Sequence, residues 1–356
     1  MRLFRLFLFP FSLVYCAVST IRNKLFDLEI LKSQSYNLPL ISIGNITVGG
    51  TGKTPVTELL LHTLGDKYKC ATLSRGYGRK THGVILAGET DNCNTIGDEP
   101  MQMKLKFPGI TIAVAEKRVE GMARLLGLDE KPEVVLLDDA YQHRYVKPGL
   151  SILVIDYHRP PWADFCLPTG NLREPISGLK RADIILVNKC PDNLNKVEAD
   201  HLRKKLKPAS HQQVFFSAIQ YEEPHCLGNT NNKLSFRDKL ADNGDVLVAV
   251  AGIGNPLPFF ESLRQYRVPL KTLSFRDHHN FDQTDLQKIA EEGSGKTTRR
   301  PEVVTTEKDA VRMFSAGLLP ESLKERLWYI PIRIRILFDQ QEIFEKIITD
   351  YVESHK

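Results

Sequence analysis

The chain has 356 residues, of which 42% are hydrophobic and 26% are charged, and its formal net charge is +5. This length is sufficient for two domains with separate cores, and the composition excludes a disordered or low-complexity chain. The charge is modest and no basic block is interleaved with aromatic residues, which argues against nucleic acid as a partner. The six cysteines form no C-x-x-C pair. Their spacing favours free thiols in a reducing compartment over disulfides or a zinc site.

The amino terminus is an apolar stretch with basic residues at both ends. Residues 6–21 are mostly apolar, two arginines precede them, and Arg22 and Lys24 follow. The stretch is short for a spanning helix, contains Pro10, and lacks the small-residue cleavage site of a signal peptide. We expect residues 1–30 to form a helix that lies on or in a membrane surface, with a buried core helix as the alternative.

Strand and helix patterns alternate along the rest of the chain. The apolar stretch "LPLISIGNI" predicts a buried strand, and residues 54–62 continue as a helix. Later apolar runs, such as "PEVVLL", "LSILVI" and "ADIILV", each end in polar residues. This alternation is typical of a mostly parallel sheet covered by helices. We predict an α/β fold with one domain over residues 31–213 and a smaller second α/β domain over residues 214–356.

A glycine-rich turn follows the first of these strands and predicts a phosphate-binding loop. Glycines let backbone N–H groups approach a phosphate, Lys53 supplies a cation, and the hydroxyl of Thr54 can bind magnesium. The strict pattern G-x-x-x-x-G-K-[ST] requires glycine where Thr47 stands. The loop resembles that of ParA-like ATPases, although Val48 replaces their leading lysine. The predicted nucleotide-binding residues are Thr47, Val48, Gly49, Gly50, Thr51, Gly52, Lys53 and Thr54.

Two carboxylates end another predicted strand, in "VVLLDDAYQHR". Asp138 or Asp139 can hold magnesium or its water at the mouth of the sheet. Acidic residues at strand ends also cap helices, so the pattern alone leaves both interpretations open. The phosphate loop favours the metal-binding interpretation.

The stretch "VNKC" at residues 187–190 partly matches the Asn-Lys-x-Asp motif with which GTPases recognise guanine. Pro191 stands at the aspartate position, and the next carboxylate is Asp192. We interpret the stretch as a strand end and do not predict guanine binding.

Three further motifs indicate phosphoryl transfer. The stretch "GDEP" contains Asp98 and Glu99, of which one can act as a base and the other can reach the metal. In "FRDHHNF", Asp277 precedes two histidines, and a histidine paired with a carboxylate can assist a base. Adjacent histidines are more often plain surface features. The pair Arg173 and Glu174 in "GNLREP" has a surface salt bridge as its simpler interpretation.

In their order along the chain, "GNITVGGTGKTP", "LSRGYGR", "GDEP", "DDAYQHR", "LREP", "AGIGNP", "DHH" and "TEKDAV" resemble the tetraacyldisaccharide 4'-kinase family. Those enzymes phosphorylate a lipid A precursor at the inner membrane of Gram-negative bacteria. The resemblance covers nearly the whole chain. Ala140 and Tyr141 stand where the family has Gly-Phe, and "PTGNLREP" differs slightly from the family's Pro-Ala-Gly-Pro-Leu-Arg-Glu-Pro. Neither departure removes a group that the reaction needs.

The resemblance implies a role for each matching residue. It assigns Asp98 as the catalytic aspartate, His278 as its partner, and Lys53 as the cation on the phosphates. It also implies that magnesium or its waters bind Thr54, Glu99 and Asp138. The other residues that it places near the substrates are Arg75, Tyr77, Asp139, Arg173, Glu174 and Asp277.

The implied reaction is transfer of the γ-phosphoryl group of ATP, with Mg²⁺, to the 4'-hydroxyl of a tetraacyldisaccharide 1-phosphate. The implied partners are this glycolipid and the membrane, at the cytoplasmic face of the inner membrane, with peripheral attachment or anchoring by the amino-terminal helix. We expect no obligate protein partner. The alternative is a membrane-associated nucleotide switch, ParA-like or GTPase-like, which leaves "GDEP" and "DHH" without a purpose.

Overall fold

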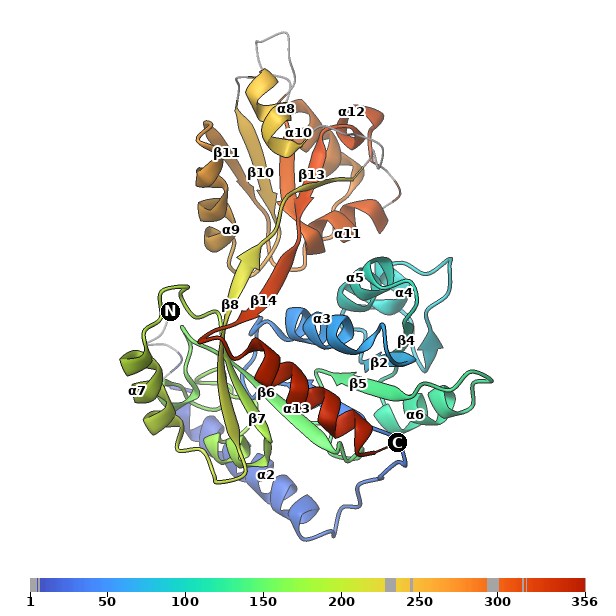
Figure 1. Cartoon of the computed structure of the whole chain (residues 1–356), viewed down its shortest axis with the longest axis vertical. Coiled ribbons are helices and arrows are strands. Elements are labelled where there is room, and N and C mark those ends of the chain that lie inside the picture. Colours follow the sequence, from blue (N-terminus) through green and yellow to red (C-terminus); the bar gives the residue numbers. More distant parts are fainter. Residues whose placement is uncertain are drawn as a thin grey trace.

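The computed structural model describes residues 5, 7–227, 235–243, 246–292, 301–315, 317 and 319–355. Within these residues the chain forms two sheets in separate domains, and the second domain lies above the first in Figure 1. The predicted α/β fold with mostly parallel sheets and a smaller second domain is confirmed.

The first sheet has the strand order β14-β8-β7-β6-β1-β5-β2-β4-β3. Its two edge strands β14 and β3 are antiparallel to their neighbours, and the other pairs are parallel. Its strands are β1 (Leu40–Gly44), β2 (Cys70–Ser74), β3 (Ile85–Leu86), β4 (Thr111–Val114), β5 (Val134–Asp138), β6 (Leu150–Asp156), β7 (Ile184–Asn188), β8 (Gln213–Tyr221) and β14 (Ile332–Ile336). The helices of this domain are α2 (Phe9–Asp27), α3 (Lys53–Leu64), α4 (Cys93–Ile96), α5 (Asp98–Lys106), α6 (Arg118–Leu126), α7 (Lys196–Leu206) and α13 (Gln341–Glu353), with short 3-10 turns at Pro161–Ala163 and Ile176–Arg181.

The second sheet has the order β11-β10-β12-β13-β9, with β9 antiparallel to β13. Its strands are β9 (His225–Cys226), β10 (Leu247–Ala251), β11 (Leu270–Ser274), β12 (Val303–Thr306) and β13 (Leu327–Ile330). Its helices are α8 (Phe236–Asn243), α9 (Leu257–Ser262), α10 (Gln283–Glu292), α11 (Glu307–Ser315) and α12 (Glu321–Lys324), with a 3-10 turn at Leu263–Tyr266.

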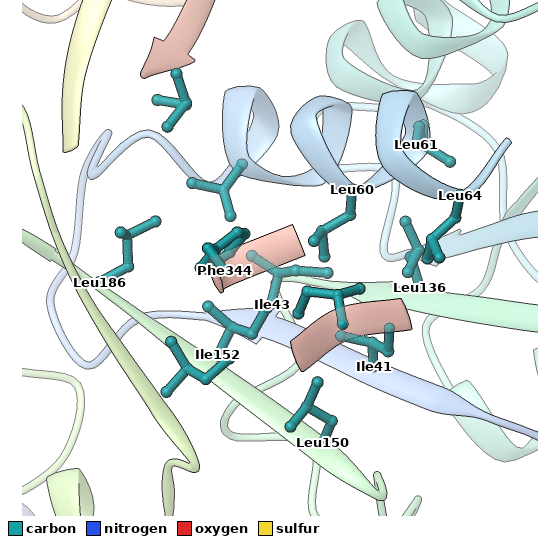
Figure 2. Packing of buried hydrophobic residues seen from close by; sticks show 14 of the residues in the cluster. Ile41, Ile43, Leu60, Leu61, Leu64, Leu136, Leu150, Ile152, Leu186 and Phe344 are labelled. Carbon is teal, nitrogen blue, oxygen red and sulfur yellow. The ribbon is translucent and has the colours of Figure 1, made fainter. Parts of the chain in front are cut away.

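The core of the first domain lies between its sheet and helices α3 and α13. Figure 2 shows Leu60 and Leu64 of α3 above Ile41 and Ile43 of β1, and Phe344 of α13 belongs to the same cluster. These side chains are at most 1% exposed. Their burial fixes α3 on the face of the sheet. The first residue of the helix, Lys53, then stands at the carboxyl end of the sheet.

Two paired strands connect the domains. Strand β8 leaves the first sheet toward the second domain, and β14 returns beside it, with Tyr221 opposite Ile332 (Figure 1). The division predicted between residues 213 and 214 differs from this arrangement, because β8, β14 and α13 all belong to the first domain. The alternation in "IRIRI" explains the return, since Ile334 and Ile336 face the core of the first domain.

Helix α2 packs one side against the first domain and exposes the other. The hydroxyl of Ser12 donates to Thr169 Oγ1 at 2.7 Å, and the side-chain amide of Asn23 donates to Glu174 at 3.0 Å. On the outer side the exposed fractions of Phe11, Val14 and Val18 are 65%, 63% and 60%. The alternative of a buried core helix is therefore wrong. None of the helices in the described ranges is long and apolar enough to span a membrane.

Candidate active site

The phosphate loop joins β1 to α3, as predicted. Gly49 and Gly52 adopt φ angles of +93°, in the region that favours glycine. Thr47 instead forms an isolated β-bridge with Leu172, so this position of the loop does not need the consensus glycine. Val48 is tied to the same neighbouring segment, because its N–H donates to the carbonyl of Asn171 at 2.8 Å.

Lys53 stands at the first residue of α3, where the helix dipole and free N–H groups favour an anion. Its Nζ lies 3.4 Å from Asp139 Oδ1, and Arg173 Nη1 lies 2.8 Å from the same oxygen. Burial raises the pKa of Asp139, but Lys53 and Arg173 outweigh it and lower the pKa below its usual value. The carboxylate of Asp139 therefore balances two cations, Lys53 and Arg173. This group lies beside the first turn of α3, which also contains Thr54.

Asp138 and Glu99 form the acidic part of the site. Asp138 ends β5 with 1% exposure, and it accepts hydrogen bonds from the Thr57 hydroxyl at 3.3 Å and the Asp139 N–H at 3.0 Å. Burial and the charge of Glu99 raise the pKa of Asp138. Burial also raises the pKa of Glu99, but Lys308 and Lys53 outweigh it and lower the pKa. Because the charge of Lys53 contributes to the lowered pKa of Glu99, the "GDEP" segment lies within electrostatic range of the phosphate loop.

Asp98 and His278 meet across the two domains. Asp98 is the first residue of α5, rather than part of the predicted loop, and its Oδ2 lies 3.1 Å from His278 Nδ1. Arg312 Nε donates to the same oxygen at 2.7 Å, and Arg312 Nη2 lies 3.1 Å from His278 Nδ1. Burial opposes ionisation of Asp98, but the hydrogen bonds from His278 and Arg312 lower its pKa to about 2. Asp98 is therefore a carboxylate at neutral pH.

The geometry limits the hydrogen bonds that His278 Nδ1 can make at one time. A guanidinium only donates hydrogen bonds and a carboxylate only accepts them, so Nδ1 can serve Arg312 or Asp98 but not both at once. When Nδ1 carries a proton it donates to Asp98. When it does not, it accepts from Arg312 and leaves Asp98 to the guanidinium.

Sequence reasoning missed Arg312 and Lys308, the two cations of α11 that face "GDEP". Lys308 Nζ donates to Glu99 Oε1 at 3.2 Å, while Arg312, one helical turn further on, reaches Asp98. Arg312 is 4% exposed and is fixed within its own domain by the carbonyl of Gly252 and by Asp309. The spacing of four residues in "TEKDAVR" is the signal in the sequence that places both cations on one helix face.

Two of the remaining predicted residues, Tyr77 and Asp277, lie next to His278. The ring of Tyr77 makes an edge-on contact with the imidazole of His278, with centroids 5.3 Å apart. Asp277 Oδ1 lies 4.0 Å from His278 Nε2. Arg75 is exposed directly after β2.

Glu174 makes contacts of a different kind from those of its neighbour Arg173. Its carboxylate is 1% exposed and accepts from Gln142, Arg181 and Asn23 of α2. These bonds fasten the "LREP" segment to the amino-terminal helix. The simpler interpretation, a surface salt bridge between Arg173 and Glu174, is therefore wrong, because Arg173 pairs with Asp139 and Glu174 lies in a buried network.

Comparisons with known proteins match the whole chain. The family model described as tetraacyldisaccharide-1-P 4'-kinase matches residues 4–353. Two proteins named tetraacyldisaccharide 4'-kinase, from Bacteroides thetaiotaomicron and Flavobacterium johnsoniae, are 44% and 43% identical to this chain. The matches cover 98% and 100% of this chain and 93% and 99% of theirs. The crystal structure of LpxK from Aquifex aeolicus in complex with ATP superposes with a TM-score of 0.74 at 26% identity, covering 98% of this chain and 99% of that one.

Proposed function

The chain belongs to the tetraacyldisaccharide-1-P 4'-kinase family, and from this premise we propose which residues carry its reaction. It transfers the γ-phosphoryl group of ATP to the 4'-hydroxyl of a tetraacyldisaccharide 1-phosphate in lipid A biosynthesis. This is the function of a kinase and not that of a nucleotide switch.

Asp98 accepts the proton of the 4'-hydroxyl in this proposal. The observation that carries it is the 3.1 Å contact between Asp98 and His278, which joins a carboxylate of the first domain to an imidazole of the second. The transition state of phosphoryl transfer is loose, so the base mainly orients the hydroxyl and removes its proton late. His278 holds the carboxylate in place, and closure of the two domains over both substrates excludes water from the transferring group.

Lys53 and the N–H groups of the phosphate loop bind the triphosphate and offset the charge that moves with the γ-phosphoryl group. Release of Lys53 from Asp139, 3.4 Å away, lets it follow the phosphates. Arg173 can then hold Asp139 alone, because it already lies 2.8 Å from that carboxylate.

The residues also fit a magnesium ion, which supplies charge neutralisation on the β- and γ-phosphates when bound. The hydroxyl of Thr54 and the carboxylates of Glu99 and Asp138 are hard oxygen donors, and the raised pKa of buried Asp138 marks a carboxyl group without a full positive counter-charge. Within the part of the chain that the structure describes, no three histidine, cysteine, aspartate or glutamate side chains converge as a metal site of their own. Magnesium in kinases takes phosphate oxygens and waters as its other ligands.

The exposed side of α2 supports membrane attachment from the cytoplasmic face of the inner membrane. Phe11, Val14, Val18 and Ile21 recur at three- and four-residue spacing, and each is more than half exposed. Lys24 lies in the last turn, where it can meet anionic headgroups. The acylated acceptor stays in the bilayer, so an attached enzyme meets it by diffusion in two dimensions.

The double substitution Val14→Glu and Val18→Glu is expected to lower binding to vesicles of phosphatidylethanolamine and phosphatidylglycerol by about 10- to 100-fold. The reason is loss of apolar area and added repulsion from anionic lipid. Vesicle sedimentation measures the change. The matched control is Val197→Glu on α7, because Val197 is 80% exposed on the same domain. Equal vesicle binding by both variants would rule out α2 as the membrane contact.

The kinase assignment is tested by incubating the purified protein in detergent with γ-labelled ATP, magnesium and the tetraacyldisaccharide 1-phosphate. We expect label in the lipid. Label that appears only in free phosphate would support a nucleotide switch and contradict the proposed roles of Asp98 and His278.

A further inference from the structure

A group of polar side chains behind the phosphate loop takes no part in the mechanism above. It comes from the carboxyl ends of β6 and β7, and from the turn after each strand. Its members are Asp156, Arg159, Asn188 and Lys189.

Asn188 holds the loop through a buried amide. Its Nδ2 donates to the carbonyl of Thr51 at 3.0 Å, and its Oδ1 accepts from the Ser217 hydroxyl at 3.0 Å. The Asn188 side chain is fully buried. A Cβ atom on Gly52 would lie 2.2 Å from Asn188 Nδ2, so the close approach of this amide requires glycine in the loop.

Lys189 holds the peptide group between Gly50 and Thr51, one residue before the peptide group that Asn188 holds. Its ammonium group donates to the carbonyl of Gly50 and lies 2.9 Å from Asp156 Oδ2. Arg159 Nη2 approaches the same carbonyl at 3.4 Å. The backbone of Lys189 adopts φ +61°, an uncommon conformation for lysine that costs free energy and persists where the surrounding structure enforces it.

These bonds fix the direction in which the loop presents its donors. The C=O and N–H of one trans peptide point in opposite directions. Tying the carbonyls of Gly50 and Thr51 to Lys189 and Asn188 therefore turns the N–H groups of Thr51 and Gly52 to the opposite side. Converging N–H groups are what a bound phosphate requires.

We propose that Asn188 and Lys189 are positioning residues for the triphosphate, which hold the phosphate loop in its binding conformation before ATP arrives. This inference rests on the proposed role of the loop as the ATP site. It gives the "VNKC" stretch a purpose other than base recognition. It also accounts for the uncharged Val48, since the cations beside this loop are Arg159 and Lys189, from the turns after β6 and β7.

The test is binding of a fluorescent ATP analogue and magnesium to the full chain, without the lipid acceptor. Lys189→Met should raise the dissociation constant and the KM for ATP by about 10-fold, because the loop loses the charged hydrogen-bond donor that holds the Gly50 carbonyl. The KM for the lipid and kcat should stay close to wild type, and Lys189→Arg should restore most of the affinity.

The matched control is Lys207→Met, since Lys207 also has a positive φ, +48°, and is exposed at the end of α7. Unchanged ATP affinity in Lys189→Met, with or without a lower Tm, would show a purely structural ion pair and overturn the inference. If that variant does not fold, Ser217→Ala gives the same test through the orientation of the Asn188 amide. Because binding is measured without acceptor, failure of lipid phosphorylation would contradict the proposed function and leave this result valid.

Discussion

Replacing Asp98 with asparagine is expected to lower kcat for lipid phosphorylation by about 10²- to 10⁴-fold, the range for loss of a general base. Asparagine keeps the shape of the side chain but cannot accept the proton of the 4'-hydroxyl. Binding of ATP should stay close to wild type, because Asp98 lies at the start of α5 and not in the phosphate loop. Steady-state kinetics and binding of a fluorescent ATP analogue measure the two effects separately.

A different Asp–His pair, which lies within the second domain, provides the control. His279 Nε2 lies 2.7 Å from Asp285 Oδ2, next in sequence to His278 but within the second domain alone. Asp285→Asn should leave kcat near the wild-type value. Nearly wild-type turnover by Asp98→Asn, with intact ATP binding, would remove Asp98 from the reaction.

Replacing Arg312 with methionine is expected to damage both stability and turnover. The guanidinium pairs with Asp309, which is fully buried, and with Asp98 across the domains. Removing one partner of a buried ion pair costs ~3–5 kcal/mol, because the remaining charge is left without compensation. Asp98 also loses the guanidinium that donates to its Oδ2 at 2.7 Å, so the carboxylate is held less firmly and we expect kcat to fall as well.

Unfolding of the second domain can be followed by the fluorescence of Trp328, which is 3% exposed, in a Trp162→Phe background. Arg312→Lys should lie between wild type and Arg312→Met, since it keeps a charge but not the fork that reaches Asp98 and Asp309 together. Arg264→Met, an exposed arginine of the same domain, is the control. An Arg312→Met protein as stable and active as this control would contradict the proposed importance of the buried pair.

The first half of the site was predictable because its chemistry is local in sequence. A buried strand, a glycine turn and Gly-Lys-Thr at a helix start specify the loop within about fifteen residues, and "VVLLDD" specifies the neighbouring strand end. Position 47 shows why the imperfect consensus still works, since Thr47 lies in a bridge with Leu172, outside the strained part of the loop.

The second half depends on contacts between distant segments. Asp98 and His278 are 180 residues apart, and only resemblance to a family joined them before the structure did. No local pattern reveals that Arg312 reaches Asp98, because this depends on how α11 docks on α5. The predicted domain division missed the return of the chain for the same reason, because no local pattern shows that β14 pairs with β8 in the first sheet.

The path of the chain between the domains has a consequence for biosynthesis. The segment between Tyr221 and Ile332 is continuous, so the second domain has its whole sequence available while residues 332–356 are still in the ribosome. The first domain does not yet have its whole sequence at that point, because its core needs Phe344, Ile348 and Val352 from α13. We therefore expect the first domain to complete its fold after the second, so that ATP binding appears only once α13 has been synthesised.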